Sequence, residues 1–200
     1  MRKAFLGISL LLIFSLRLTA QDKLEVFGGY QYQDVGGNLG WQIGSGFNGW
    51  DGAVTYNITQ HFGVTGDFTG NYHSGNFGGT PYYSHIYTYA GGPAFSFGST
   101  GSHYKPFVHV LFGEAHITTP SQYGESPDPY MSGSGIAMLF GAGVDYRLKK
   151  SMAIRLGQFD WIYYHNKDLG DFIGVYSSSR GDSPNFASNV RISTGVVFRF

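Results

Sequence analysis

Histidines are the side chains of this 200-residue sequence best suited to acid–base chemistry, and there are seven of them. A histidine that acts as a general base needs a nucleophile and a carboxylate within hydrogen-bond reach. His85, His109 and His116 have no serine and carboxylate companions at a fixed spacing. Ser84 adjoins His85, but neighbours in a strand face opposite ways. We therefore predict no catalytic residues.

Metal and cofactor sites have no better support in the sequence. At strand spacing His109 and His116 point to opposite faces, and no histidine-rich cluster occurs. The sequence contains no cysteine, which excludes disulfides, thiolate metal sites and a cysteine nucleophile. We predict neither a metal nor a cofactor.

Charged residues are few and balanced. They make up 13% of the sequence, with thirteen basic and thirteen acidic residues, so the formal net charge is zero. Nucleic-acid binding requires a basic face with clustered lysines and arginines, which this composition does not provide. We exclude nucleic acid as a partner.

Alternation of apolar with small or polar residues is the pattern that must position these side chains. It is clearest in 50–58 and 62–72, where the apolar residues stand at even positions. A period of two is typical of strands with two unlike faces. Eight such segments are predicted: 23–34, 50–58, 62–72, 86–97, 107–118, 136–147, 152–165 and 189–200.

Two segments depart from simple alternation. Glu114 and His116 share the parity of the apolar residues before them, so either the strand leaves the apolar layer or a bulge shifts it; their facing stays open. Arg155 and Asp160 have opposite parities, which predicts a bulge near Gly157.

The connections alternate in length. Long ones are predicted at 35–49, 73–83, 119–134 and 166–184, and short ones at 59–61, 98–105 and 149–151. An even strand number with long loops at one end and tight turns at the other is the topology of an outer-membrane barrel. Closure leaves no unpaired sheet edge in hydrocarbon. We predict an all-β fold, an eight-stranded antiparallel transmembrane β-barrel with both termini in the periplasm.

A secreted β-sandwich or lipocalin-like barrel is the alternative fold. Its exposed face would be rich in Lys, Glu and Thr, whereas the polar face here is mostly small residues that fit a narrow interior. Aromatic residues near segment ends are candidates for interfacial girdles: Trp50, Tyr56, Phe62, Tyr72, Tyr87, Phe97, Tyr146 and Trp161.

Charged side chains in the strands must face inward or lie at a rim, because an arginine facing lipid at mid-depth costs about 2–4 kcal/mol. An eight-stranded barrel has room inside for side chains but gives no open channel. We expect ion pairs that plug the interior rather than a gated polar path. The interior candidates are Glu25, Asp51, Asp67, Asp145, Arg147, Arg155, Asp160, Arg191 and Arg199.

The first twenty residues have the organisation of a secretory signal peptide. Arg2 and Lys3 precede an apolar run over 4–16, and Ala20 is a small residue at the expected cleavage point before Gln21. A membrane anchor is the alternative, but a spanning helix needs about 20 apolar residues. The predicted organisation is a signal peptide over 1–20 and a barrel domain over 21–200.

The signal peptide, the eight segments and the terminal Val196-Val197-Phe198-Arg199-Phe200 resemble the OmpA/OmpX-like outer-membrane β-barrel family. The resemblance covers essentially the whole mature chain and concerns architecture. It implies that the barrel-assembly machinery recognises a C-terminal signal, Val196, Phe198 and Phe200. Because the chain stops on Phe200, the peptidoglycan-binding domain of longer members is not expected.

The resemblance implies a bacterial outer-membrane protein, expected to be monomeric and surrounded by outer-membrane lipid. Its expected role is structural, surface-interaction or adhesion, with the long loops contacting any surface ligand; which ligand is left open. The alternatives are a lipid A-modifying enzyme of the outer leaflet and a small-solute porin. Lipid A deacylases of this size use a His-x-Ser arrangement, which is missing at His165. Arg180-Gly181-Asp182 matches the integrin-binding tripeptide, but such a match arises easily by chance.

Overall fold

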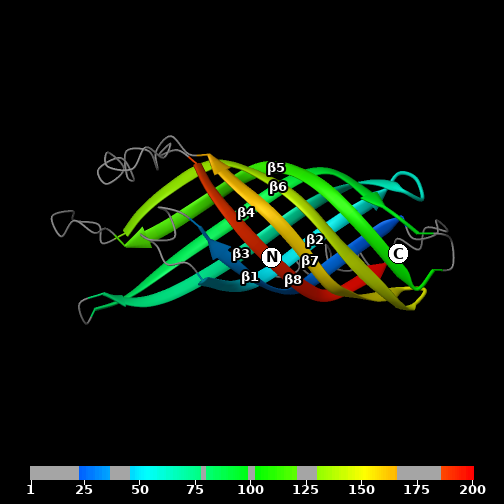
Figure 1. Ribbon diagram of the computed structural model, residues 1–200, viewed down its shortest axis with the longest axis horizontal. Helices are drawn as coiled ribbons and strands as arrows, with labels where there is room; N and C mark the ends of the chain where they lie inside the picture. Colours follow the sequence, from blue (N-terminus) through cyan, green and yellow to red (C-terminus); the bar gives the residue numbers. More distant parts are fainter. Residues whose placement is uncertain (1–22, 37–45, 78–79, 99–101, 121–129, 166–185) are drawn as a thin grey trace, which may run out of the picture.

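The computed structural model describes residues 23–36, 46–77, 80–98, 102–120, 130–165 and 186–200. Each strand pairs antiparallel with the next, and the last returns to the first, which closes the barrel (Figure 1). The predicted eight-stranded closed meander is confirmed. Its strands are β1 (Leu24–Val35), β2 (Gly46–Asn57), β3 (Phe62–Phe77), β4 (Thr80–Ser96), β5 (Tyr104–Pro120), β6 (Tyr130–Lys149), β7 (Met152–His165) and β8 (Phe186–Arg199).

The seam between β1 and β8 runs the full length of β1. It extends from the pair Glu25 and Arg199 to the pair Val35 and Asn189 without a shift in register. The seam leaves no free edge on β1 and closes the barrel along β8 from Asn189 to Arg199, as the sequence predicts for the terminal segment. No helix among the described residues is long and apolar enough to cross a membrane.

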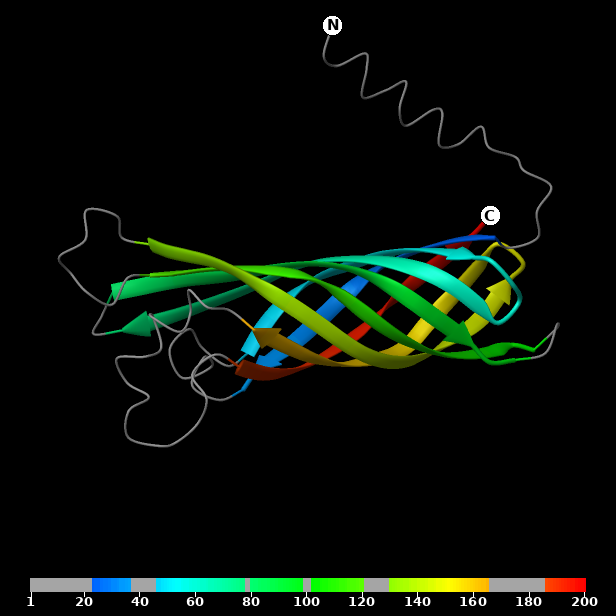
Figure 2. The same ribbon diagram turned by 90° about the horizontal axis from the view of Figure 1, so that it is seen from above.

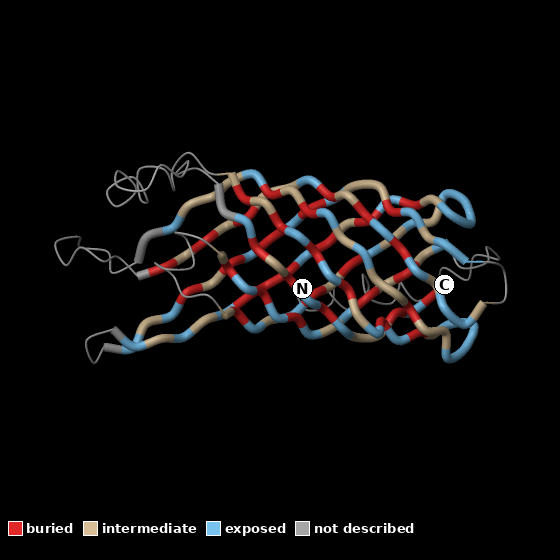
Figure 3. The backbone as a smooth tube through the Cα atoms, in the orientation of Figure 1, coloured by how far each residue is buried: buried red, intermediate tan, exposed pale blue. Residues whose placement is uncertain are grey.

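Buried and exposed residues alternate along the strands (Figure 3). Large apolar side chains point outward: Trp161 is 58% exposed and Tyr30 is 55% exposed. On the outside, Trp50 Nε1 donates to the Tyr72 hydroxyl at 3.4 Å, and that hydroxyl lies 3.2 Å from the hydroxyl of Tyr87. An apolar outside with linked aromatic residues is the surface expected of a barrel in lipid.

A bulge in β7 brings two charges to the same side of the wall. The register between β7 and β8 shifts between Arg155 and Gln158, around Gly157, and this confirms the predicted bulge. Without the extra residue, Arg155 and Asp160 would face opposite sides. With it, both side chains are buried in the interior.

Strand β5 has no bulge. Its pairing with β6 runs from Tyr104 to Pro120 without a shift in register. Leu111 and Ala115, which have the same parity, are both buried. Glu114 and His116 therefore lie on the outside of the barrel, both half-exposed. Of the two possibilities, the bulge is excluded.

The two ends of the barrel differ in their connections. We call the end with connections 58–61, 97–103 and 150–151 the turn end, and the opposite end the loop end. The predicted short turns at the turn end are confirmed. The predicted long loop at 166–184, which contains Arg180-Gly181-Asp182, lies outside the described residues, as does the cleavage site at Ala20 and Gln21.

The loop predicted over 73–83 is wrong. Strands β3 and β4 stay paired from Tyr72 and His85 to Phe77 and Thr80, because each strand satisfies the backbone groups of the other. Strands β2 and β6 likewise begin inside predicted loops, at Gly46 and Tyr130. As a result β3–β6 extend past the other four strands at the loop end in both views (Figures 1 and 2). We call this extension, residues 73–77, 80–86, 116–120 and 130–135, the outer wall.

Candidate functional site: the barrel interior

An arginine held by two aspartates lies at the centre of the interior. Arg191 of β8 donates from its two terminal nitrogens to Asp67 of β3, at 3.0 and 3.2 Å. Its Nε donates to Asp160 of β7 at 2.8 Å. All three side chains are almost completely buried. Because these charges are buried, removing one partner would leave an unpaired buried charge.

A histidine bonds to the second oxygen of Asp160. The Nε2 of His109 lies 2.7 Å from Asp160 Oδ1. In the sheet, His109 of β5, Gly141 of β6 and Asp160 of β7 stand directly beside one another. A β-carbon on Gly141 would overlap both side chains. The absence of a side chain at Gly141 therefore allows the His109–Asp160 bond to cross β6.

Gly141→Ala is expected to destabilise the barrel by about 1–3 kcal/mol, because the new methyl group displaces the His109–Asp160 pair. Urea unfolding of the protein in detergent or lipid measures the loss. Gly52→Ala is the matched control, since a β-carbon there has nothing nearer than 3.8 Å. Equal losses in the two variants would contradict this account of Gly141.

A second cluster joins Asp160 to the turn end. Gln158 donates from Nε2 to Asp160 at 2.7 Å and accepts from Arg155. Arg155 donates from Nε to Asp145 at 2.9 Å. Its guanidinium carbon lies 4.1 Å from the ring centre of Phe27 and 4.3 Å from that of Phe107. Aromatic faces stabilise a cation in this position.

The ion pairs continue to the mouth of the barrel at the turn end. Arg199 lies 3.8 Å from Asp145 and 3.3 Å from Glu25. Lys105 Nζ, which is partly exposed, lies 2.6 Å from Glu25. A chain of charged and amide side chains from Lys105 to Asp67 thus fills the half of the interior nearest the turn end.

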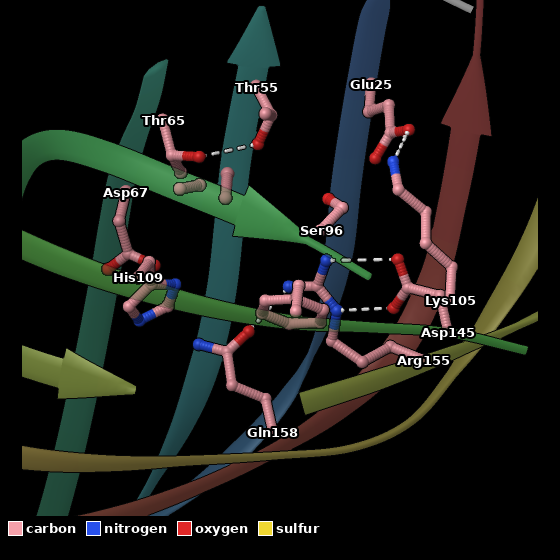
Figure 4. Close-up of a pocket in the computed structure, with 13 residues that line it drawn as sticks. Glu25, Thr55, Thr65, Asp67, Ser96, Lys105, His109, Asp145, Arg155 and Gln158 are labelled. Carbon is pink, nitrogen blue, oxygen red and sulfur yellow. Dashed lines mark hydrogen bonds and ion pairs between the residues drawn. The ribbon is translucent and has the colours of Figure 1, made fainter. Parts of the chain in front are cut away.

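A small cavity lies among these side chains (Figure 4). Its volume, counted as space open to the centres of water molecules, is about 20 Å³, which holds one or two waters. Figure 4 shows Arg155, Asp145 and Lys105 on one side of it and Thr55 and Thr65 on the other. A cavity of this size has room for water beside the ion pairs but gives no path for a solute.

The other half of the interior is closed by neutral and apolar groups. Asn71 joins Gln31 to Gln33, and Gln33 donates to the hydroxyl of Tyr164 at 3.1 Å. Beyond these amides lies an apolar cluster that we call the apolar plug: Val35, Phe47, Ile86, Ala90, Leu111, Ala115, Ile117, Ala137, Leu139, Ile162 and Tyr164. The plug fills the interior toward the loop end.

Eight of the nine predicted interior charges are buried inside the barrel. Of the nine, all except Asp51 and Arg147 form ion pairs. Asp51 is buried near Arg191 and beside Ser193 without an ion pair, and Arg147 is half-buried at the turn end. Of the predicted C-terminal signal, Phe198 and Phe200 are exposed on the outside and Val196 is half-exposed.

Sequence reasoning missed Lys105, His109 and Gln158 as members of the ion-pair chain. His109 has the parity of the buried Phe107 and Leu111, so the alternation of apolar and polar residues predicts that its side chain faces inward. The partnership with Asp160 required the register of β5, β6 and β7, which the sequence alone does not give.

On the outside, one histidine has a serine partner that the spacing did not reveal. His116 Nδ1 lies 2.9 Å from Ser134 Oγ on the neighbouring β6. The nearby Glu114 accepts a hydrogen bond from Tyr89. Ser84 is buried inside and His85 faces out, as predicted. In the part of the chain that the structure covers, no three histidine or acidic residues are grouped as metal ligands.

Three solved structures are similar to this barrel. The first is Ail, the attachment invasion locus protein of Yersinia pestis, in complex with the heparin analogue sucrose octasulfate; it has a TM-score of 0.57 and 17% identity, over 88% of this chain and 97% of Ail. Neisserial surface protein A has a TM-score of 0.55 and 14% identity, over 89% and 97%. The outer membrane protein OprG from Pseudomonas aeruginosa has a TM-score of 0.51 and 11% identity, over 88% and 95%.

No family model matches the sequence, and no curated protein matches it. At 11–17% identity the likeness establishes the fold alone. The chain has the closed eight-stranded fold of outer-membrane barrel proteins.

Proposed function

We propose that the protein is a bacterial outer-membrane barrel whose sealed body carries the outer wall to the cell surface, in a structural, surface-contact or adhesion role. The filled interior is the observation that carries this proposal. Ion pairs occupy the half near the turn end, and the apolar plug occupies the half near the loop end. A barrel without a passage can act through its rims and its outer surface, but not as a conduit.

The proposed orientation rests on three of the four connections at the loop end, 36–45, 121–129 and 166–185, which are longer than any connection at the turn end. In barrels of the outer membrane, short turns face the periplasm and longer loops face outward. The turn end, with the start of β1 and the end of β8 beside it, is then periplasmic, and the outer wall is extracellular. The row formed by Val196, Phe198 and Phe200 would serve as the signal for the assembly machinery.

The outer wall offers hydroxyl, amide and aromatic groups to a ligand. Tyr83 is 56% exposed, and Ser74 and Asn76 are exposed on the paired strand. The described part of the wall has no lysine or arginine. Ail is known in complex with a sulfated ligand. The described wall residues here suit an uncharged sugar better, through stacking on tyrosine and hydrogen bonds to hydroxyls.

Planar-bilayer recording together with cell-binding assays tests the proposal. The protein is expected to give no steady conductance and to bind host cells. Tyr83→Ala is expected to weaken that binding, whereas Tyr30→Ala, on the apolar outside of the barrel below the outer wall, is expected to leave it unchanged. Solute-dependent conductance would instead favour the small-solute porin. Absence of binding would reduce the role to a structural one.

The lipid A-modifying alternative is best tested at the His116–Ser134 pair. This pair resembles a base and its nucleophile, but Glu114 hydrogen-bonds to Tyr89, and no carboxylate contact to His116 is present in the described chain. Lipid A mass spectra from cells with the natural protein, with Ser134→Ala and without the protein are expected to be identical. A product that disappears in the Ser134→Ala strain would establish an enzyme.

A further inference from the structure

Basic side chains outside the interior are concentrated at the turn end. Among the described residues they are Lys23, Lys149 and Lys150. The three lysines are exposed. The outward-facing acidic residues of the described chain, Asp34 and Glu114, lie toward the loop end of their strands. The outside of the barrel is therefore positive at the turn end and negative nearer the loop end.

Backbone hydrogen bonds hold the three lysines on one continuous arc. The N–H of Arg199 donates to the carbonyl of Ser151, which follows Lys150, at 3.0 Å. Leu24 and Phe200 exchange hydrogen bonds at 3.2 and 2.9 Å, and Lys23 precedes Leu24. The arc thus runs from the turn between β6 and β7, past the end of β8, to the start of β1. We call Lys23, Lys149 and Lys150 the basic rim.

The apolar outside surface ends at the basic rim. Leu148, immediately before Lys149, is 45% exposed, and Phe198 and Phe200 are exposed at the end of β8. A lysine beside such residues lays its aliphatic stem along the apolar surface and reaches toward water with its ammonium group. In a membrane whose apolar layer ends at this rim, the ammonium groups would lie at the depth of the lipid headgroups.

We propose that the basic rim binds the phosphate groups of anionic phospholipids in the leaflet around the turn end. An ammonium group donates up to three hydrogen bonds and attracts the phosphodiester charge. No aspartate or glutamate side chain of the described chain lies on the outside of this rim to compete. Lys105 is excluded, because its ammonium group is already paired with Glu25. The inference rests on the proposed membrane location.

The test compares retained lipids in the purified full-length protein by native mass spectrometry. The protein is titrated with phosphatidylglycerol or, separately, with zwitterionic phosphatidylcholine. Phosphatidylglycerol is expected to be preferred, and the triple variant Lys23→Gln, Lys149→Gln and Lys150→Gln is expected to lose at least about tenfold of that preference. The matched control, in which arginine replaces all three lysines, keeps the charge and is expected to keep the preference.

Three outcomes would overturn the proposal. The natural protein could retain both lipids equally, or the glutamine variant could keep the preference for phosphatidylglycerol. Inorganic phosphate at the same concentration as the lipid could also displace phosphatidylglycerol from the protein. A heat-dependent shift in electrophoretic mobility checks that each variant is folded. Adhesion and conductance are not read out in this experiment. Its failure therefore leaves the proposed function standing, and failure of adhesion leaves the lipid preference standing.

Discussion

Arg191→Met is expected to produce the largest loss of stability of any single substitution in the barrel. The arginine neutralises both Asp67 and Asp160 and is completely buried. Removing one partner of a buried ion pair typically costs about 3–5 kcal/mol, because the remaining charge is left without compensation. Here both carboxylates lose their arginine, and Asp160 keeps its bonds to His109 and Gln158. Refolding into lipid, followed by the heat-dependent mobility shift and by urea unfolding, should show little or no folded barrel.

A variant that removes all three charges of this group separates electrostatics from packing. Combining Arg191→Met with Asp67→Asn and Asp160→Asn removes the positive charge and both negative charges together. Replacement of a complete buried ion-pair group is often close to neutral, so this variant is expected to recover most of the lost stability. The amide that replaces the Asp160 carboxylate can still accept a hydrogen bond from His109. If the triple variant is as unstable as Arg191→Met, packing rather than charge accounts for the loss.

The faces of the strands were predictable from the sequence, since lipid outside and a narrow interior impose opposite demands on alternate residues. The same rule located the bulge, because Arg155 and Asp160 cannot both avoid lipid unless the parity changes between them. It also placed the charges inside. Partnerships between those charges were not predictable. Arg191 and Asp67 are 124 residues apart, and their contact depends on barrel closure and the register of every strand between them.

Two features were not predictable from the sequence, each for a different physical reason. Ser74, Gly75 and Asn76 have the composition of a loop, yet cross-strand hydrogen bonds extend β3 through them. The apolar plug places Leu111, Leu139 and Ile162 on the face that elsewhere carries polar and small residues. The alternation leaves the direction of such side chains ambiguous, because a large aliphatic side chain suits lipid and a dry interior equally well.

Leu139→Ala is expected to destabilise the barrel by about 2–5 kcal/mol. This is the usual cost of truncating a buried leucine when neighbouring atoms cannot fill the space that it leaves. Leu139 is completely buried in the plug, where it is clustered with Leu111 and Ile162. Leu148→Ala is the matched control, because it removes the same atoms from a side chain that is 45% exposed at the turn end. Its loss, measured by urea unfolding in the same lipid, is expected to be less than half as large.

Conductance gives the same substitution a second readout. A cavity lined by aliphatic side chains stays dry, so the space left by Leu139→Ala should not admit a file of water, and the variant should remain electrically silent. A polar replacement differs, because Leu139→Ser gives water a hydrogen-bonding partner within the plug. Because the ion pairs still fill the half of the interior nearest the turn end, Leu139→Ser combined with Leu111→Ser should admit water into the plug without producing current. Steady current in that double variant, with the barrel still folded, would show that the apolar plug is the only seal.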